Sequence, residues 1–177
     1  MGTTGHLITF GANATTRADR QTVLDALRDL PAHLEWAGTR SPQKTFRLLS
    51  LDAPATPASV GTRFSSTGAN MNGTFHDTSV VTVADANTFE FHTASRLDRR
   101  HGAELLVHFV HRYDVEPEGA GSRIVYSCRA HNGNYVPYWL KPGMRAMTRR
   151  MIDRSMTKQL HLLAELAEDR AISPAVD

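Results

Sequence analysis

The sequence contains a single cysteine, Cys128, which excludes an internal disulfide and leaves too little sulfur for a thiolate metal site. It contains no CxxC, no GxSxG and no glycine-rich phosphate loop, so three common classes of active-site motif are absent. Its nine histidines show no metal-binding spacing, because His108 and His111 are three residues apart in an expected strand and face opposite sides. We expect no metal and no cofactor, and chemistry carried by side chains alone.

The sequence also lacks an apolar run long enough to cross a membrane, and its first residues lack the basic-then-apolar order of a signal peptide. We therefore expect a cytoplasmic protein without a membrane partner. The formal net charge of +2 is too small to argue for nucleic-acid binding. With 177 residues, 41% of them hydrophobic, the chain fits one domain over residues 1–177 with a core from about 6 to 168.

The most informative stretch runs from about Lys141 to Glu168, where apolar residues recur at the 3.6-residue period of an amphipathic helix. The first half of its apolar arc carries methionines and the second half carries leucines. Leucine packs a dense core, whereas methionine adapts to irregular space. We expect the leucine half to be core and the methionine half to be either ordinary core or the wall of a cavity.

The rest of the chain predicts one strand, two short helices and then six strands. The first helix is capped by Thr15 or Thr16 and runs through Leu30, and the second carries Leu34 and Trp36 and ends at Gly38. Short links between the strands favour antiparallel pairing. The predicted fold is α+β, with a seven-stranded antiparallel sheet curled around the long C-terminal helix. The expected strands are 6–10, 45–51, 60–67, 74–83, 88–95, 105–116 and 122–131.

Strand 105–116 places polar groups on its apolar side. Alternation puts His111 and Tyr113 on the same face as Phe109, which should look toward the helix. Buried polar groups need partners, and either a neighbouring strand or a ligand would serve. His111 is the best candidate general acid or base, because its unperturbed pKa lies near neutrality. Tyr126 faces the same side as Cys128 and is a candidate hydrogen-bond donor to a ligand carbonyl.

Arg63 and Asp77 lie in neighbouring expected strands, and the sequence leaves two interpretations open. They form a structural ion pair, or Arg63 binds a ligand oxygen. The candidate catalytic residues are therefore His111, Tyr126 and Arg63.

The aromatic segment 132–139 is either a lid over the cavity or a hydrophobic plug. The candidate ligand-binding residues are Trp36, Phe91, Phe109, His111, Tyr113, Tyr126, Tyr138, Met144, Met147 and Met151.

In the order of its fragments the chain resembles the START-like (SRPBCC) superfamily, the helix-grip fold of Bet v 1-type allergens and polyketide cyclase/dehydrase proteins. The resemblance implies a cavity for an apolar small molecule between sheet and helix, but no common catalytic set, so no residue role is carried over. The fragments that carry it are Leu34-Glu35-Trp36-Ala37-Gly38, Val60-Gly61-Thr62-Arg63-Phe64, Val81-Thr82-Val83-Ala84-Asp85 before Phe89-Glu90-Phe91, and Tyr113-Asp114-Val115-Glu116-Pro117 before Gly121-Ser122-Arg123-Ile124.

Three functions follow as hypotheses. The first is a binding protein for a polyketide-like or lipid-like molecule. The second is an aromatase/cyclase in which His111 is the base, and Tyr126 or Arg63 holds the enolate oxygen. The third is a protein-interaction module without a ligand. Arg145, Arg149, Arg150 and Arg154 form either a solvated face or a docking surface for an acidic partner such as an acyl carrier protein. The oligomeric state is left open.

Overall fold

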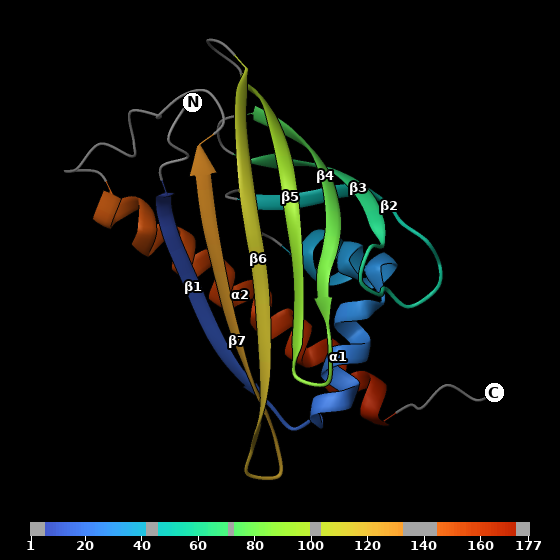
Figure 1. Cartoon of the computed structure of the whole chain (residues 1–177). Helices are drawn as coiled ribbons and strands as arrows, with labels where there is room; N and C mark the ends of the chain where they lie inside the picture. Colours follow the sequence, from blue (N-terminus) through green and yellow to red (C-terminus); the bar gives the residue numbers. More distant parts are fainter. Residues whose placement is uncertain (1–5, 42–45, 71–72, 100–103, 133–144, 173–177) are drawn as a thin grey trace.

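The computed structural model describes residues 6–41, 46–70, 73–99, 104–132 and 145–172 (Figure 1). It contains one seven-stranded antiparallel sheet in the order β1-β7-β6-β5-β4-β3-β2, so the predicted fold class is confirmed. The strands are β1 (His6–Thr16), β2 (Phe46–Asp52), β3 (Arg63–Asn70), β4 (Gly73–Ala84), β5 (Thr88–Arg99), β6 (Leu105–Glu118) and β7 (Gly121–Asn132). The helical segments are α1 (Arg20–Arg28), η1 (Leu30–Ala32), η2 (Glu35–Thr39) and α2 (Arg145–Ile172).

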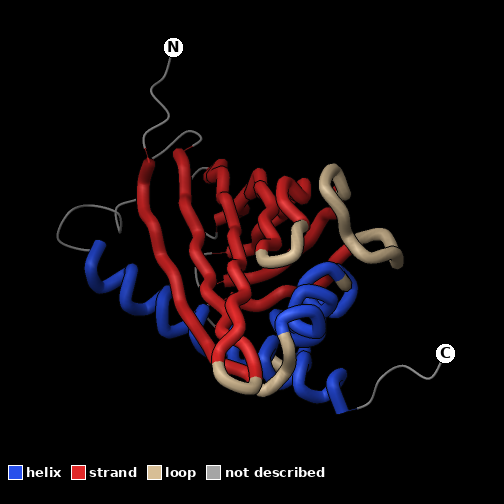
Figure 2. Tube along the Cα trace, turned by 60° about the horizontal axis from the view of Figure 1, so that its bottom comes forward, coloured by secondary structure: helices blue, strands red, loops and turns tan. Residues whose placement is uncertain are grey.

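Both helices lie on one side of the curled sheet, as Figures 1 and 2 show. We call the side of the sheet that faces them the inner face. The helix α2 packs mainly along β1 and reaches α1 near its C-terminal end. Within the ranges described, no helix combines the length and the apolar character that a membrane crossing requires.

The first strand is longer than the sequence indicated. β1 pairs with β7 up to Thr16, and the first helix begins only at Arg20, with Asp19 as its N-cap. The Asp19 carboxylate accepts a hydrogen bond from the Thr22 backbone N–H at 2.9 Å, which satisfies one of the free donors of the first turn. The expected cap at Thr15 or Thr16 was wrong, because pairing with β7 holds both residues in the extended conformation.

Two other boundaries also differ from the prediction. β5 continues to Arg99, past the predicted end at Ser95, because it stays paired with β4 over its whole length. The last helix continues to Ile172, past the predicted end at Glu168. Its final turn is held by an ion pair of 2.6 Å between Arg170 and Asp29, the residue that ends α1. In both cases a partner distant in sequence extends the element.

The interior is closed at the end of the sheet that carries the β6–β7 hairpin. Here Leu24 and Leu27 of α1 and Leu163 of α2 are fully buried against Phe89 and Ile124 of the sheet. The leucine half of α2 therefore belongs to the core, as predicted. Its register along β1 is set by polar contacts, which include Thr16 Oγ1 donating to Glu168 at 3.1 Å and the Gly11 N–H donating to Asp153 at 3.0 Å.

Candidate binding site inside the curled sheet

The inner face of β6 is buried at both ends and partly accessible in its middle. Val115 and Tyr113, near the hairpin, are 1% and 6% exposed, whereas His111, Phe109 and Val107 keep part of their surface. All five point to the inner face, because they alternate along one strand without a bulge. The packing beneath β6 is thus complete near the hairpin and again at Leu105, which is 4% exposed, and incomplete between these ends, at His111, Phe109 and Val107.

His111 and Tyr126 form the polar centre of this region. The His111 Nδ1 atom lies 2.8 Å from the Tyr126 hydroxyl, within hydrogen-bond distance. The two residues sit on neighbouring strands, since His111 pairs with Cys128 and Tyr126 with Tyr113. The His111 ring also stacks on Phe91 with centroids 4.7 Å apart. Across the part of the chain that is described, His111 Nε2 has no hydrogen-bond partner, so one ring nitrogen remains available to a ligand.

The environment of His111 favours its neutral form. Burial lowers the pKa of His111 from 6.5 to about 3, and the nearby His92 acts in the same direction. A neutral imidazole carries one N–H, so one nitrogen donates and the other accepts. The sequence proposed His111 as general acid or base because the unperturbed pKa of histidine lies near neutrality, and burial moves the pKa of His111 away from that range. At neutral pH His111 acts as a hydrogen-bonding group, while a group of such low pKa is a weak general base.

Tyr126 and Cys128 complete the same cluster from β7. Tyr126 is 4% exposed, and burial raises its pKa well above the ordinary value of 10.0. Burial also raises the pKa of the Cys128 thiol from 9.0 to about 12, and the Tyr126 hydroxyl is its hydrogen-bond partner. Because the thiolate is the reactive form, Cys128 is a buried apolar group and not a nucleophile, as expected from the sequence.

The structure separates Arg63 from the candidate site. Arg63 is exposed on the outer face, where it pairs with Val80 of β4. Asp77 pairs with Ser66, three positions away and on the inner face. The two side chains form no ion pair, so that alternative was wrong. Because the Arg63 side chain lies on the outer face, it does not reach an oxygen of a ligand next to His111. Asp77 is the inward member of the pair.

The predicted aromatic residues that the structure describes lie on the inner side. Phe91, Phe109 and Tyr113 surround His111, and the Phe91 and Tyr113 rings lie 6.4 Å apart. Trp36 is buried in η2 next to His33, with ring centroids 5.1 Å apart. The Trp36 indole nitrogen is buried without a hydrogen-bond partner within the described ranges. The predicted residue Tyr138 and the segment 133–139 lie outside the described residues.

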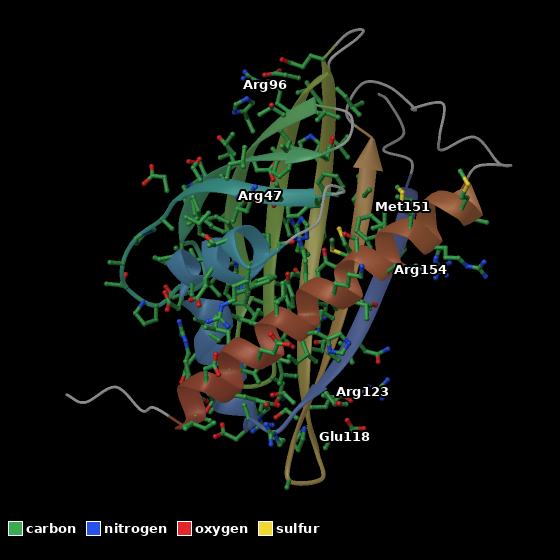
Figure 3. All side chains as sticks on the ribbon, turned by 180° about the vertical axis from the view of Figure 1, so that it is seen from behind. Arg47, Arg96, Glu118, Arg123, Met151 and Arg154 are labelled. Carbon is green, nitrogen blue, oxygen red and sulfur yellow. The ribbon has the colours of Figure 1, made fainter. Side chains whose placement is uncertain are left out.

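Two of the three predicted methionines, Met147 and Met151, do not face the interior. Met147 and Met151 are 62% and 41% exposed, and Met144 lies outside the described residues. Figure 3 shows Met151 and Arg154 on the N-terminal half of α2, near the place where the helix crosses β1. The side of this half that faces the sheet instead carries Ile152, Ser155, Met156 and Gln159. The packing of α2 against β1 decides which of its side chains face inward. The periodicity of the sequence alone does not determine this orientation.

Two polar contributions to the interior were not among the predicted site residues. The side chain of Gln159 on α2 is buried, and its Nε2 atom has no hydrogen-bond partner within the described ranges. On the sheet, the Ser79 and Thr93 hydroxyls are buried and hydrogen-bonded to each other at 2.8 Å. The alternation of Phe75, Asp77, Ser79 and Val81 was the available signal, because it places two polar residues on an otherwise apolar face.

A hollow of about 370 Å³ lies along the exposed side of α2. Its lining is basic, with Arg149, Arg150 and Arg154 beside Asp153. Arg149 and Asp153 form an ion pair of 3.6 Å, whereas Arg150 and Arg154 have no carboxylate partner among the described residues. We call these residues the arginine hollow. It is separate from the interior site. No group of three His, Cys, Asp or Glu side chains in the described ranges is arranged to hold a metal ion.

Comparison with known families gives one match over nearly the whole chain. The profile of the family described as "Polyketide cyclase / dehydrase and lipid transport" matches residues 8–168. This range begins in β1 and ends in α2, so it includes every strand and the interior site. No curated protein matches the sequence.

Several solved structures share this fold at low sequence identity. The protein TTHA0849 from Thermus thermophilus is 16% identical, with a TM-score of 0.67 over 94% of this chain and 99% of that one. An uncharacterized protein from Rhizobium leguminosarum is 12% identical, with a TM-score of 0.64 over 92% and 95%. The Bet v 1-like protein Ara h 8.0201 is 14% identical, with a TM-score of 0.53 over 89% and 98%. At such identities the likeness establishes the fold alone.

Proposed function

This chain belongs to the polyketide cyclase/dehydrase and lipid-transport family, and on that premise we propose that it binds an apolar or aromatic small molecule between the sheet and α2. The observation that carries the proposal is the incomplete packing of the inner face of β6 at His111, Phe109 and Val107. A partly accessible stretch between two buried ends, inside a curled sheet, is suited to a ligand. The stacked rings of Phe91 and His111 offer it a flat apolar contact.

Binding is better supported than catalysis. A cyclase that abstracts a proton next to a carbonyl needs a base of suitable strength, and the low pKa of His111 works against that role. The free Nε2 atom of His111 is suited to hold a ligand oxygen or hydroxyl in place. We therefore keep the aromatase/cyclase function as the alternative, with His111 and Tyr126 positioning the carbonyl. Replacing His111 by Ala and measuring cyclised product from a carrier-bound polyketide tests it, because unchanged turnover removes the proposed role.

Filling the interior is expected to weaken ligand binding. Val107 lies on the inner face and keeps part of its surface, so Val107→Trp places a large ring in the proposed space. We expect at least a tenfold loss of affinity for pyrene, measured by fluorescence titration, because a tenfold loss needs only about 1.4 kcal/mol.

The matched control is His108→Trp, one residue further along the same strand, because His108 is exposed on the outer face. This variant should bind pyrene as the wild type does. Circular dichroism confirms that both variants fold. Wild-type protein that takes up no pyrene at micromolar concentration, or equal binding by all three proteins, would contradict the proposed function.

A second candidate function, favoured by the arginine hollow, is the docking of an acidic protein such as an acyl carrier protein. Arg150 and Arg154 are exposed, and lack a carboxylate partner within the described ranges, so they are free to pair with acidic side chains. The exposed position of the hollow on α2 leaves room for a protein surface.

Charge reversal tests this docking. We expect the double variant Arg150→Glu and Arg154→Glu to bind an acyl carrier protein about tenfold or more weakly in low salt, with a smaller difference at high ionic strength, because salt screens exposed charges. Arg123→Glu is the control, since Arg123 lies near the β6–β7 hairpin, well away from Arg154 (Figure 3). Equal loss in the control would indicate unspecific charge attraction, and no loss in the double variant would exclude the arginine hollow.

A further inference from the structure

A band of polar side chains crosses the inner face between two separate apolar clusters. One cluster is the main core, which includes Val81 and Phe91. The other lies near the opposite end of the sheet and is built from Phe75, Leu97 and Leu105. The band between them consists of Ser66, Asp77, Ser79, Thr93 and Ser95, and we call it the polar band. It is an interruption of the apolar surface at one level of the sheet.

The strand register fixes the positions of these residues. Asp77 pairs with Ser66 of β3 on one side and with Ser95 of β5 on the other. In the next row toward the hairpin, Ser79 pairs with Thr93. Ser79 and Thr93 satisfy each other at 2.8 Å, so their hydroxyls are already partnered. Asp77 is the charged member of the polar band, and the described residues satisfy only part of its hydrogen-bonding capacity.

Within the described ranges, the Asp77 carboxylate has a hydrogen-bond donor for one of its two oxygen atoms only. The Ser95 hydroxyl donates a hydrogen bond to it. Its Oδ1 atom is buried and has no hydrogen-bond partner among the described residues, and no described cation forms an ion pair with it. A buried carboxylate oxygen without a donor loses its hydration and gains nothing in return, and such atoms are rare in folded proteins. The missing partner is therefore the feature to explain.

Asp77 is distinct from the His111 and Tyr126 cluster. Asp77 and His111 lie two strands apart across the sheet and four residues apart along it, because Asp77 pairs with Ser95 and Ser95 pairs with Val107. At about 4.8 Å between strands and about 3.3 Å per residue, the separation is roughly 16 Å. Thr93 and Phe109 lie between them on the same face. A ligand of elongated shape that reaches both places would contact a neutral imidazole at one end and a carboxylate at the other.

We propose that Asp77 is a ligand-binding residue that accepts a hydrogen bond from a hydroxyl group of the bound molecule, so that the ligand class is hydroxylated apolar compounds and not carboxylic acids. The proposal rests on the proposed function, since it assumes that a small molecule occupies the interior. Oδ1 can accept only from a donor, and phenols and alcohols supply one on an apolar frame. A ligand carboxylate at this place would meet the like charge of Asp77 in an environment of low polarity, which is unfavourable.

Three pyrenes that share one ring system test the proposal. At pH 7.5 we expect wild-type protein to bind 1-hydroxypyrene about tenfold or more tightly than 1-methylpyrene, because a hydrogen bond to a charged group contributes that much. Pyrene-1-carboxylate should bind more weakly than 1-methylpyrene. In Asp77→Leu the preference for the hydroxyl should disappear and the carboxylate should bind better than in wild type, while the affinity for 1-methylpyrene changes less than threefold.

Thr78→Leu is the matched control, because Thr78 is the next residue of β4 and is exposed on the outer face. It should keep the wild-type order of the three probes. Asp77→Asn serves where the leucine variant does not fold, and it should reduce the preference for the hydroxyl and relieve the exclusion of the carboxylate. Equal binding of hydroxyl and methyl probes by the wild type, or an order unchanged by either Asp77 variant, overturns the role of Asp77 and leaves the proposed function standing. Absence of binding for all three probes overturns both.

Discussion

Acidification from pH 7 to pH 4 is expected to lower the free energy of unfolding by about 3 kcal/mol through His33 alone. His33 is 5% exposed, and burial lowers its pKa from 6.5 to about 4 although its Nε2 atom lies 2.7 Å from the Leu27 carbonyl oxygen. The unfolded chain binds a proton near pH 6.5 and the folded chain only near pH 4. The contribution is complete above about 6.5 and is lost as the pH falls toward 4.

His111 acts in the same direction, because its pKa is also lowered. Its effect should be smaller than its pKa suggests, since part of its surface is accessible and water there would favour the charged form. The carboxylates Asp19, Asp85 and Glu168 have pKa values lowered by hydrogen bonds, so their contributions are lost only below their ordinary values of 3.8 to 4.5. The loss between pH 6.5 and 4.5 is therefore mainly due to the two histidines, and protonation of Asp77, whose pKa is raised to about 6, offsets part of it.

Urea unfolding at pH 7.5, 6.0, 5.0 and 4.5 measures this loss. In His33→Gln, which keeps a donor for the Leu27 carbonyl, the decline between pH 7.5 and 4.5 should be smaller than in wild type, even though the variant starts from a lower stability. His161→Gln is the control, because His161 is exposed on α2 and its replacement should leave the decline unchanged. A His33→Gln curve parallel to that of the wild type would show that His33 does not bind its proton as described.

The second large effect is a gain in stability: Asp77→Asn is expected to be more stable than wild type at pH 7.5 by about 2 kcal/mol. Burial raises the pKa of Asp77 from 3.8 to about 6, despite the hydrogen bond from Ser95. A carboxyl group with a raised pKa in the folded state stabilises that state below its unfolded pKa, and this stability is lost as the pH rises through about 6. The difference between the two pKa values corresponds to about 3 kcal/mol, and the accessible surface of Asp77 reduces the expected value.

The comparison of two pH values separates this effect from simple repacking. At pH 4.5 the folded wild type already carries a protonated Asp77, so the advantage of Asp77→Asn should shrink to less than about 1 kcal/mol. Asp98→Asn is the control, because Asp98 is an exposed carboxylate of the neighbouring strand that pairs with His76 and Arg96. Its replacement should change the stability little at either pH. A gain for Asp77→Asn that is the same at both pH values would show that ionisation of Asp77 is not its cause.

The two measurements on Asp77 bear on each other. A residue that destabilises the folded protein and yet gives selectivity for a hydroxyl exchanges stability for binding, which is common at functional sites. A ligand hydroxyl that donates to Oδ1 should also stabilise the folded protein by its binding free energy. Stability without ligand and selectivity with ligand are therefore expected to change in opposite directions in Asp77→Asn.

The sequence was sufficient for the architecture and for the polar centre of the interior. Alternation of period two placed His111, Tyr113 and Phe109 on one face, and the period of 3.6 identified the last helix, because these patterns are set by local backbone geometry. The resemblance to the START-like superfamily is confirmed by the family match and by the fold. The burial of Cys128 and of the leucines of α2 also followed from local pattern.

Tertiary structure determined the orientations and environments that the sequence pattern could not distinguish. Arg63 and Asp77 lie in adjacent strands, and only the pairing register shows that one faces outward and the other inward. The same applies to α2, whose packing on β1 exposes Met151 and turns Gln159 inward. The pKa of His111 depends on how many protein atoms surround it, which no local spacing encodes. Spacing along the chain determines which residues share a face, whereas burial, register and charge environment arise only from segments far apart in sequence that meet in the folded protein.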